Sequence, residues 1–277
     1  LFGGAIHIAG AVKARGDARR AHSDWMKIEQ QRGISVTSTV MHFEYGGAVF
    51  NLLDTPGHED FSEDTYRTLT AVDSAVMVLD AAKGIEERTR KLFEICRLRD
   101  IPIITFINKM DRDEIDIDGV VATVRERLGR QVIVLQWAIN VGEGFNQIID
   151  LIDMKLVTYN DGKSTPSEIP ADLQGHAREL HEQLVESVAE TDEELMEKYF
   201  SEGELGREEL VEGLCKAVLK LDIFPAFVGD SYNNVGIDQL INAIVDYGPC
   251  PLESPGLSYE NRQGDAEKLS AESPLAA

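Results

Sequence analysis

The sequence predicts an α/β fold, built around a mostly parallel β-sheet with helices on both faces. Two observations support this class. Short apolar runs typical of buried strands alternate with segments of helical apolar spacing, as expected for successive βα units. The clearest runs also end directly in polar loops, and open α/β sheets bind their ligands at the carboxyl ends of the strands.

The expected elements follow in chain order. Residues 35–45 alternate in places and predict an edge strand, whereas 49–53, 74–80 and 103–107 are apolar runs that predict buried strands. Residues 85–99 predict an amphipathic helix. Its apolar positions are Ile85, Leu92, Ile95 and Leu98.

Two motifs follow two of these strands. After 49–53 comes Asp54-Thr55-Pro56-Gly57-His58, and after 103–107 comes Asn108-Lys109-Met110-Asp111. Both are expected at the ligand-binding edge of the sheet. Together they predict a guanine-nucleotide site, in which the first motif meets the γ-phosphate and magnesium and the second meets the base.

The second motif has a narrow chemistry. The Asp111 carboxylate can accept two hydrogen bonds from the ring N–H and the exocyclic amine of guanine, a pair that adenine does not offer. The Lys109 stem can lie over the purine plane, and the Asn108 amide can tie neighbouring loops together. The alternative for all three residues is a polar turn after a strand.

The first motif supplies the phosphate side. Asp54 is expected to reach Mg²⁺ through a water molecule, and the Gly57 N–H to meet the γ-phosphate. Phosphoryl transfer needs mainly positioning and charge stabilisation, so His58 is a candidate for orienting the attacking water. A surface histidine, or one satisfied in the core, is the alternative.

Residues 54–61 resemble the ribosome-dependent translational GTPases. Segments 23–35 and 61–70 are similar to bacterial peptide chain release factor 3, and this resemblance covers about residues 1–112. In that family a hydroxyl in the motif Arg-Gly-Ile-[Thr/Ser] binds Mg²⁺ in the GTP state. The resemblance therefore implies Ser35 as a metal ligand, with Thr37 as a nearby competitor.

The second half resembles the inserted subdomain of elongation factor G. The similar segments are 125–139, 192–199 and 235–247. The family also has a Gly-Ser-Ala loop whose backbone N–H groups face the guanine carbonyl. Here Gly229-Asp230-Ser231 stands in that place, and these residues are expected to contact the base.

The resemblance also implies a division of the chain. Residues 1–133 and 222–250 are expected to form a GTPase core, with an inserted α/β subdomain at 134–221. Residues 251–277 would be a linker toward a β-barrel domain, and 258–277 are expected to lack regular structure. The phosphate-loop motif Gly-x-x-x-x-Gly-Lys-[Ser/Thr] has no match in the 277 residues, so the first strand and the phosphate loop are expected to be missing.

Composition is consistent with a globular cytoplasmic protein. Apolar residues make up 43% of the chain, and no run is long enough for a membrane span. The three cysteines are widely spaced, which favours reduced thiols; they are Cys96, Cys215 and Cys250. We expect a monomer without membrane contact.

The net charge of −22 is unevenly distributed. Residues 168–213 contain fifteen acidic side chains against three basic ones. A solvated helix face is one interpretation, and a docking surface is the other, because this subdomain faces the ribosomal stalk protein in elongation factor G. The basic cluster of Lys13, Arg15, Arg19 and Arg20 could meet ribosomal RNA phosphates or form a solvated loop.

The sequence thus predicts a GTPase that binds GTP or GDP with Mg²⁺ and hydrolyses GTP on the ribosome. The resemblance favours a release factor 3-like role, in which the switch drives departure of the decoding release factors. Translocation, as in elongation factor G, is the alternative. A ribosome-binding module without turnover is an alternative of another class.

Overall fold

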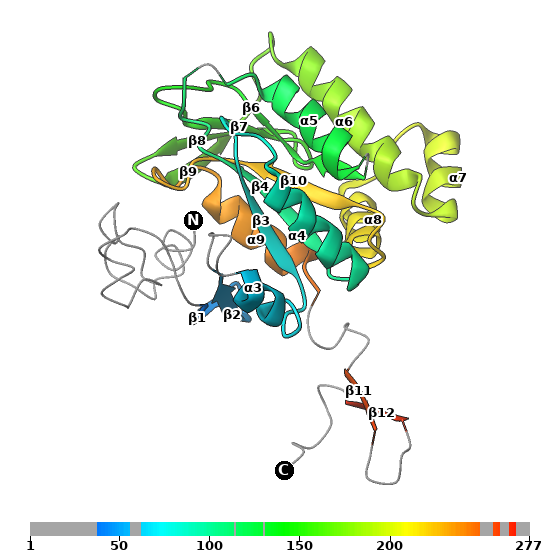
Figure 1. The fold of residues 1–277 in the computed structure, drawn as a ribbon. Coiled ribbons are helices and arrows are strands. Elements are labelled where there is room, and N and C mark those ends of the chain that lie inside the picture. The colour runs from blue at the N-terminus through cyan, green and yellow to red at the C-terminus, as the bar shows by residue number, and fades with distance from the viewer. Residues whose placement is uncertain are drawn as a thin grey trace.

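The computed structural model describes most of the chain (Figure 1). The described residues are 38–55, 62–113, 115–129 and 131–249, together with two short strands at 257–260 and 266–269. Ser35, Pro56, Gly57, His58 and the N-terminal basic cluster lie outside these ranges. No helix in the described ranges combines the length and the apolar character needed to cross a membrane.

A four-stranded parallel sheet forms the centre. Its strands lie in the order β3 (Ala75–Asp80), β4 (Ile103–Asn108), β10 (Phe224–Val228) and β5 (Val132–Val134). Every residue of β4 and β10 is buried. The predicted α/β class with a mostly parallel sheet is confirmed.

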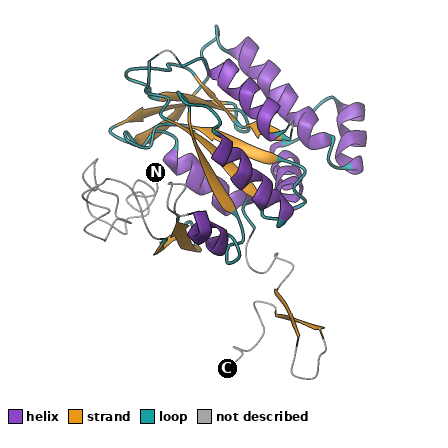
Figure 2. Ribbon diagram, in the orientation of Figure 1, coloured by secondary structure: helices purple, strands orange, loops and turns teal. Residues whose placement is uncertain are grey.

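Helices cover both faces of this sheet (Figure 2). On one face α4 (Glu87–Leu98) and α5 (Ile117–Leu128) pack with Ile103 and Ile107 of β4. On the other face, residues from α9 (Ile237–Tyr247) pack in one cluster with Ile104 and Phe106. Because side chains alternate along a strand, β4 contributes to both layers of the core.

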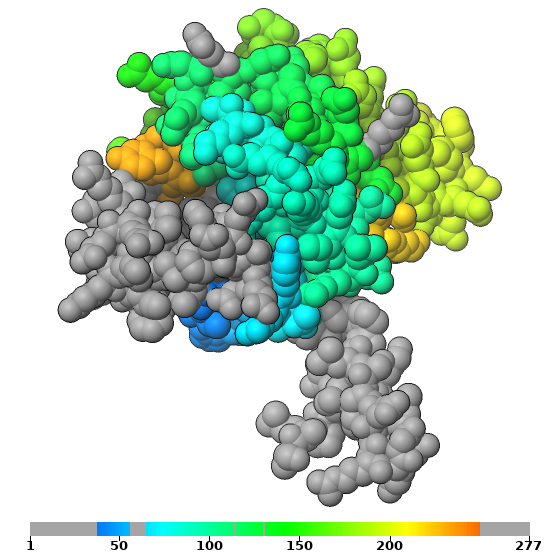
Figure 3. All heavy atoms as spheres, viewed as in Figure 1, coloured from blue at the N-terminus to red at the C-terminus, as the bar shows by residue number. Residues whose placement is uncertain are grey.

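Between β5 and β10 the chain builds a second sheet and three helices. The antiparallel sheet has the order β6 (Gln136–Ala138), β7 (Gln147–Asp150), β8 (Lys155–Asn160) and β9 (Lys163–Ser167). The helices are α6 (Gln174–Ala189), α7 (Glu193–Glu202) and α8 (Arg207–Leu219). They form the lobe at the right of Figure 3.

This segment shares a core with the parallel sheet. Buried residues of α6 and α8, such as Leu184 and Leu214, belong to the same cluster as Phe106 of β4. Gln136 of β6 is only 2% exposed, and its Oε1 accepts a hydrogen bond from the Val228 N–H at 3.0 Å. Its amide nitrogen donates to Gln239 of α9. Gln136 thus continues the hydrogen bonding of β10 beyond the point where β5 ends.

The burial expected for 49–53 is wrong. These residues lie in β2 (Ala48–Asp54), which pairs antiparallel with β1 (Thr39–Tyr45) in a separate two-stranded sheet. Among the described residues β2 has no other strand partner, and Val49 is 58% exposed. For the same reason β3, predicted to be fully buried, is an edge strand of the central sheet, and its Val78 is 42% exposed.

The apolar stripe expected on α4 is also partly wrong. The helix buries Phe93 and Cys96, whereas Leu98 is 85% exposed. Residues 93 and 96 share a helix face, and residue 98 lies about 140° away from residue 93 at 100° per residue. Burial raises the pKa of the Cys96 thiol to about 11, which keeps it protonated.

The expectation of no regular structure at 258–277 is wrong for two short segments. Strand β11 (Leu257–Glu260) pairs antiparallel with β12 (Ala266–Leu269). This hairpin stands apart from the central sheet (Figure 1). The two strands satisfy backbone groups by pairing with each other, which needs no contact with the main body.

Candidate functional site

The carboxyl ends of three neighbouring strands bring together the residues of the candidate site. Asp80 ends β3, Asn108 ends β4, and Gly229 follows β10. Since these strands are parallel and adjacent, their ends meet at one edge of the sheet. The base-side motif, Asn108-Lys109-Met110-Asp111, therefore lies at the carboxyl edge of the sheet, as the sequence predicts.

Asn108 connects the loops after β4 and β10. Its Nδ2 donates to Ser231 Oγ at 3.0 Å, and its Oδ1 accepts from the Ser231 N–H at 2.9 Å. Two backbone bonds run beside this pair, from Gly229 N to Ile107 O at 2.9 Å and from Met110 N to Gly229 O at 3.2 Å. The two loops are thus held as one unit before any ligand binds.

Lys109 turns toward the end of β3. Its backbone is left-handed, with φ +69°, and its ammonium donates to Asp80 Oδ2 at 2.5 Å. The other oxygen of Asp80 accepts from the Ala82 N–H at 3.1 Å. Burial opposes ionisation of Asp80, but the hydrogen bond and charge of Lys109 outweigh it and lower the pKa of the carboxyl. The Asp80 carboxyl is therefore ionised at neutral pH.

Asp111 has a carboxylate that is available to a ligand. The side chain is half-buried, and no described residue forms a hydrogen bond or an ion pair with it. It lies two residues after Lys109 on the loop fixed by Asn108. A carboxylate that is held in place and lacks a protein donor can accept hydrogen bonds from a ligand, which fits a guanine edge.

The Asp230 side chain bonds within its own loop. The residue is 1% exposed, and its carboxylate accepts from Tyr232 N at 2.8 Å, Asn233 N at 3.3 Å and Asn233 Nδ2 at 2.5 Å. Burial, together with the nearby charge of Asp111, raises the pKa of Asp230 despite these bonds. The side chain therefore organises its own loop.

The backbone donors of this loop are also engaged. The Gly229 N–H donates to Ile107 O, the Asp230 N–H to Val235 O at 3.0 Å, and the Ser231 N–H to Asn108. In the structure these donors bond within the protein, and the expected contact of Gly229-Asp230-Ser231 with the base stays a prediction. Donation is local because the loop closes on itself through the Asp230–Val235 bridge.

Gly236 closes this loop, and its replacement gives a first prediction. Gly236 has φ +79°, and a Cβ there would lie 2.5 Å from Val228 O; Gly203 also has φ +79° but has open space around it. Gly203→Ala should cost about 1 kcal/mol from backbone strain. Gly236→Ala should cost at least about 2 kcal/mol more than that, because a main-chain carbonyl must move. Urea unfolding of both variants measures the difference, and equal losses would contradict the predicted clash.

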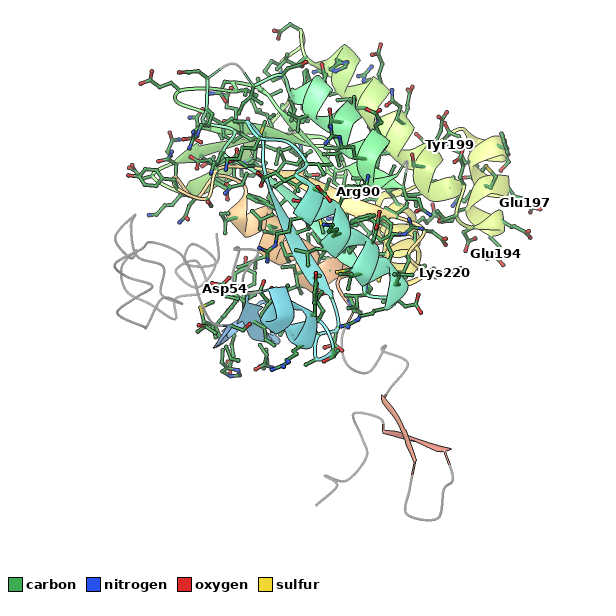
Figure 4. All side chains as sticks on the ribbon, viewed as in Figure 1. Asp54, Arg90, Glu194, Glu197, Tyr199 and Lys220 are labelled. Carbon is green, nitrogen blue, oxygen red and sulfur yellow. The ribbon has the colours of Figure 1, made fainter. Side chains whose placement is uncertain are left out.

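The phosphate side is described only in part. Asp54 and Thr55 are half-buried at the end of β2, in the hairpin at the lower left of Figure 4, where Asp54 is labelled. Of the expected magnesium ligands, Asp54 alone lies in the described ranges. Those ranges contain no group of three His, Cys, Asp or Glu side chains that could hold a metal ion. The described residues therefore define the geometry of the predicted base-binding part of the site, but only a small part of the predicted phosphate-binding part.

Sequence reasoning missed Asp80. A signal was present, because an acidic residue ends the apolar run 74–80 as Asp54 ends 49–53. What the sequence did not provide was the strand order. Asp80 is the register partner of Asn108 in adjacent parallel strands.

A parallel sheet with an open carboxylate and a paired lysine at its carboxyl edge defines a nucleotide-binding domain of the GTPase type. Comparison with known families agrees. The family model described as elongation factor Tu GTP binding domain matches residues 2–250, and the chain belongs to this family of translation factor GTPases.

Among curated proteins, the chain is similar to peptide chain release factor 3 of Aromatoleum aromaticum (strain DSM 19018 / LMG 30748 / EbN1). The two are 44% identical over 257 residues, which is 91% of this chain and 44% of the relative. The chain thus spans less than half the length of that protein. The match runs through both halves of the chain, including the segment between β5 and β10.

Among solved structures, the fold is similar to the crystal structure of ttk003000868 from Thermus thermophilus. The TM-score is 0.85 at 22% identity, over 92% of this chain and 39% of the other. At this identity the likeness concerns the fold alone.

Proposed function

We propose that the protein is a translation GTPase that hydrolyses GTP on the ribosome and acts like release factor 3 in termination. The observation that carries the proposal is the base-side loop. Asp111 is held beside Lys109, lacks a described protein donor, and sits on a loop fixed by Asn108 and Ser231. The 44% identity to a release factor 3 supports the choice of termination.

Base selection would follow from this arrangement. The Asp111 carboxylate accepts from the ring N–H and the exocyclic amine of guanine, while the Lys109 stem covers the ring plane. Asn108 and Ser231 hold the two loops together, so little ordering is left for the moment of binding. Adenine lacks the donor pair that Asp111 needs.

Hydrolysis would rest on the first motif. The Gly57 N–H contacts the γ-phosphate and His58 orients the attacking water when the ribosome places it. Asp54 and Ser35 are the residues that would hold Mg²⁺, which supplies charge neutralisation on the phosphates. Thr55 and Pro56 complete the loop between the strand and Gly57.

The partners we propose are the ribosome and, through it, the decoding release factors. Helix α7 presents acidic side chains outward, among them Glu194 and Glu197 (Figure 4), and this surface would dock the ribosomal stalk protein. The protein would act as a monomer in the cytoplasm. Residues 134–221 would be the inserted subdomain and 251–277 the linker of the proposed domain plan.

Two other functions remain candidates. Similarity of residues 125–139 to elongation factor G favours translocation as the second choice. A ribosome-binding module without turnover is the candidate of another class. Turnover with purified ribosomes separates an enzyme from a binding module, and release of a decoding factor from terminated ribosomes separates termination from translocation.

The sharpest test compares two lengths of the protein. Phosphate affinity in this fold comes largely from backbone N–H groups at a helix N-terminus and from the loop lysine. We expect residues 1–277 to show no GTP binding below about millimolar concentration, and the full-length gene product, with any residues that precede Leu1, to bind GTP at roughly micromolar concentration. Isothermal calorimetry measures both. Tight Mg²⁺–GTP binding by residues 1–277 would show that the phosphate-loop motif is not required, and no binding by the full-length product would contradict the proposed function.

A further inference from the structure

The ion pair between Asp80 and Lys109 is a strong side-chain contact at the candidate site that base recognition alone does not explain. The carboxylate ends β3 and the ammonium follows β4, 29 residues later. The Asp80 side chain is 18% exposed and the Lys109 side chain 39%. Asp80 is therefore a largely buried acid placed against the lysine that the base-side motif assigns to the purine plane.

The backbone around the pair is fixed on both sides. The Ala81 N–H donates to Asn108 O at 2.9 Å, which continues the β3–β4 ladder past the last residue of β3. Gly84 N donates to Asp80 O at 2.8 Å and closes a turn. Asp80 thus stands on a rigid support, and its carboxylate can define where the Lys109 ammonium rests.

The methylene groups of a lysine need such a support to pack against a purine ring in one fixed orientation. A free lysine side chain has about 2 kcal/mol of rotamer entropy, which binding a ligand would have to overcome. The left-handed backbone of Lys109 turns its side chain toward β3, and the ion pair then fixes the far end of the stem. With both ends fixed, the methylene groups have little rotamer freedom left to lose when a ligand binds.

We propose that Asp80 is a positioning residue for nucleotide binding, which holds the Lys109 stem in the orientation that covers the purine ring. This inference rests on the proposed function. Asp80 acts on the face of the ring and Asp111 on its edge. Loss of Asp80 therefore weakens all purine nucleotides alike and leaves the choice among them to Asp111.

Competition between Asp80 and the nucleotide for Lys109 would change the affinity in the opposite direction. If Asp80 competed with the nucleotide for Lys109, the ion pair would have to break on binding, and removal of the Asp80 charge would tighten binding. The sign of the change in affinity therefore distinguishes a support from a competitor.

The test uses Asp80→Asn in the full-length gene product. The amide oxygen can still accept from the Ala82 N–H, so the turn is kept while the charge is lost. Dissociation constants for GTP and ITP are measured by calorimetry; ITP lacks the exocyclic amine that Asp111 reads. We expect the dissociation constants of both nucleotides to rise about tenfold, with the ratio of the ITP constant to the GTP constant unchanged.

A double-mutant cycle with Lys109→Met shows whether the two residues act together. Methionine keeps an apolar stem but cannot pair with Asp80. We expect Lys109→Met to show a loss similar to that of Asp80→Asn, and the double variant to be no weaker than either single one. Asp80→Glu keeps the charge and should restore part of the affinity. Asp153→Asn is the matched control. Asp153 also forms an ion pair with a basic side chain, at 2.5 Å from Arg207 Nε, and it lies outside the candidate site.

Each outcome decides the inference. Three results would overturn it: unchanged or tighter nucleotide binding by Asp80→Asn, a lower ratio of the ITP dissociation constant to the GTP dissociation constant, or additive losses of affinity in the double-mutant cycle. If Asp80→Asn does not fold, Lys109→Met alone still tests it, since full affinity in that variant would show that the stem needs no support. If the wild-type protein does not bind GTP, the proposed function fails instead.

Discussion

His58→Ala in the full-length gene product is expected to slow ribosome-stimulated GTP hydrolysis by roughly 10²–10⁴, with GTP affinity near that of the wild type. This range is typical for the loss of one positioned catalytic group. The reason is its position directly after Gly57, where a side chain can orient the attacking water without contacting the base or the phosphate cradle. Single-turnover hydrolysis on purified ribosomes measures the effect.

His42→Ala is the matched control. His42 lies on the outer face of β1, where its Nδ1 forms a hydrogen bond with Asn51 Oδ1 at 3.0 Å. Its loss should leave hydrolysis unchanged. Single-turnover rates of His58→Ala within threefold of the wild type would remove His58 from the mechanism.

Asp111→Asn is expected to move base preference from guanine toward xanthine. The amide of asparagine presents a donor where the carboxylate presented an acceptor, and xanthine offers the complementary carbonyl. A base-reading site rejects the unmatched analogue strongly, because buried polar groups are left without partners. Competition between GTP and XTP on the full-length gene product measures the change.

Asp113→Asn provides the control for this exchange. Asp113 is an exposed carboxylate two residues further along the same loop. Its replacement removes the same charge and should leave the preference for GTP intact. If Asp111→Asn still prefers GTP tenfold over XTP, another residue reads the base.

The part of the fold that could be predicted is the part fixed by local pattern. The run Ile103–Asn108 is apolar for most of its length and is followed by a polar loop, and it is buried from end to end in β4. On α6, apolar residues at helical spacing supply Leu184, Val185 and Val188 to the core. In β4 the continuous apolar run marks a strand buried on both faces, and in α6 the helical spacing determines which side chains turn inward.

What could not be predicted depends on neighbours distant in sequence. The burial of β2 is set by which strands flank it, and no local pattern contains that information. The contact between Asp80 and Lys109 requires β3 beside β4. Asp230 illustrates a third limit, since no local pattern shows that its carboxylate accepts hydrogen bonds from Tyr232 and Asn233.

Gln136 has a consequence for how this protein tolerates recombination with its relatives. Its side chain completes the hydrogen bonding of Val228, the residue just before the base-side loop, and also contacts α9. The helices α6 and α8 fill the same hydrophobic core as β4. The stretch between β5 and β10 is therefore not a transferable cassette. A chimera that imports it from another family member must also import a matching partner for Val228 and a matching surface for Phe106, or the nucleotide loop loses its anchor.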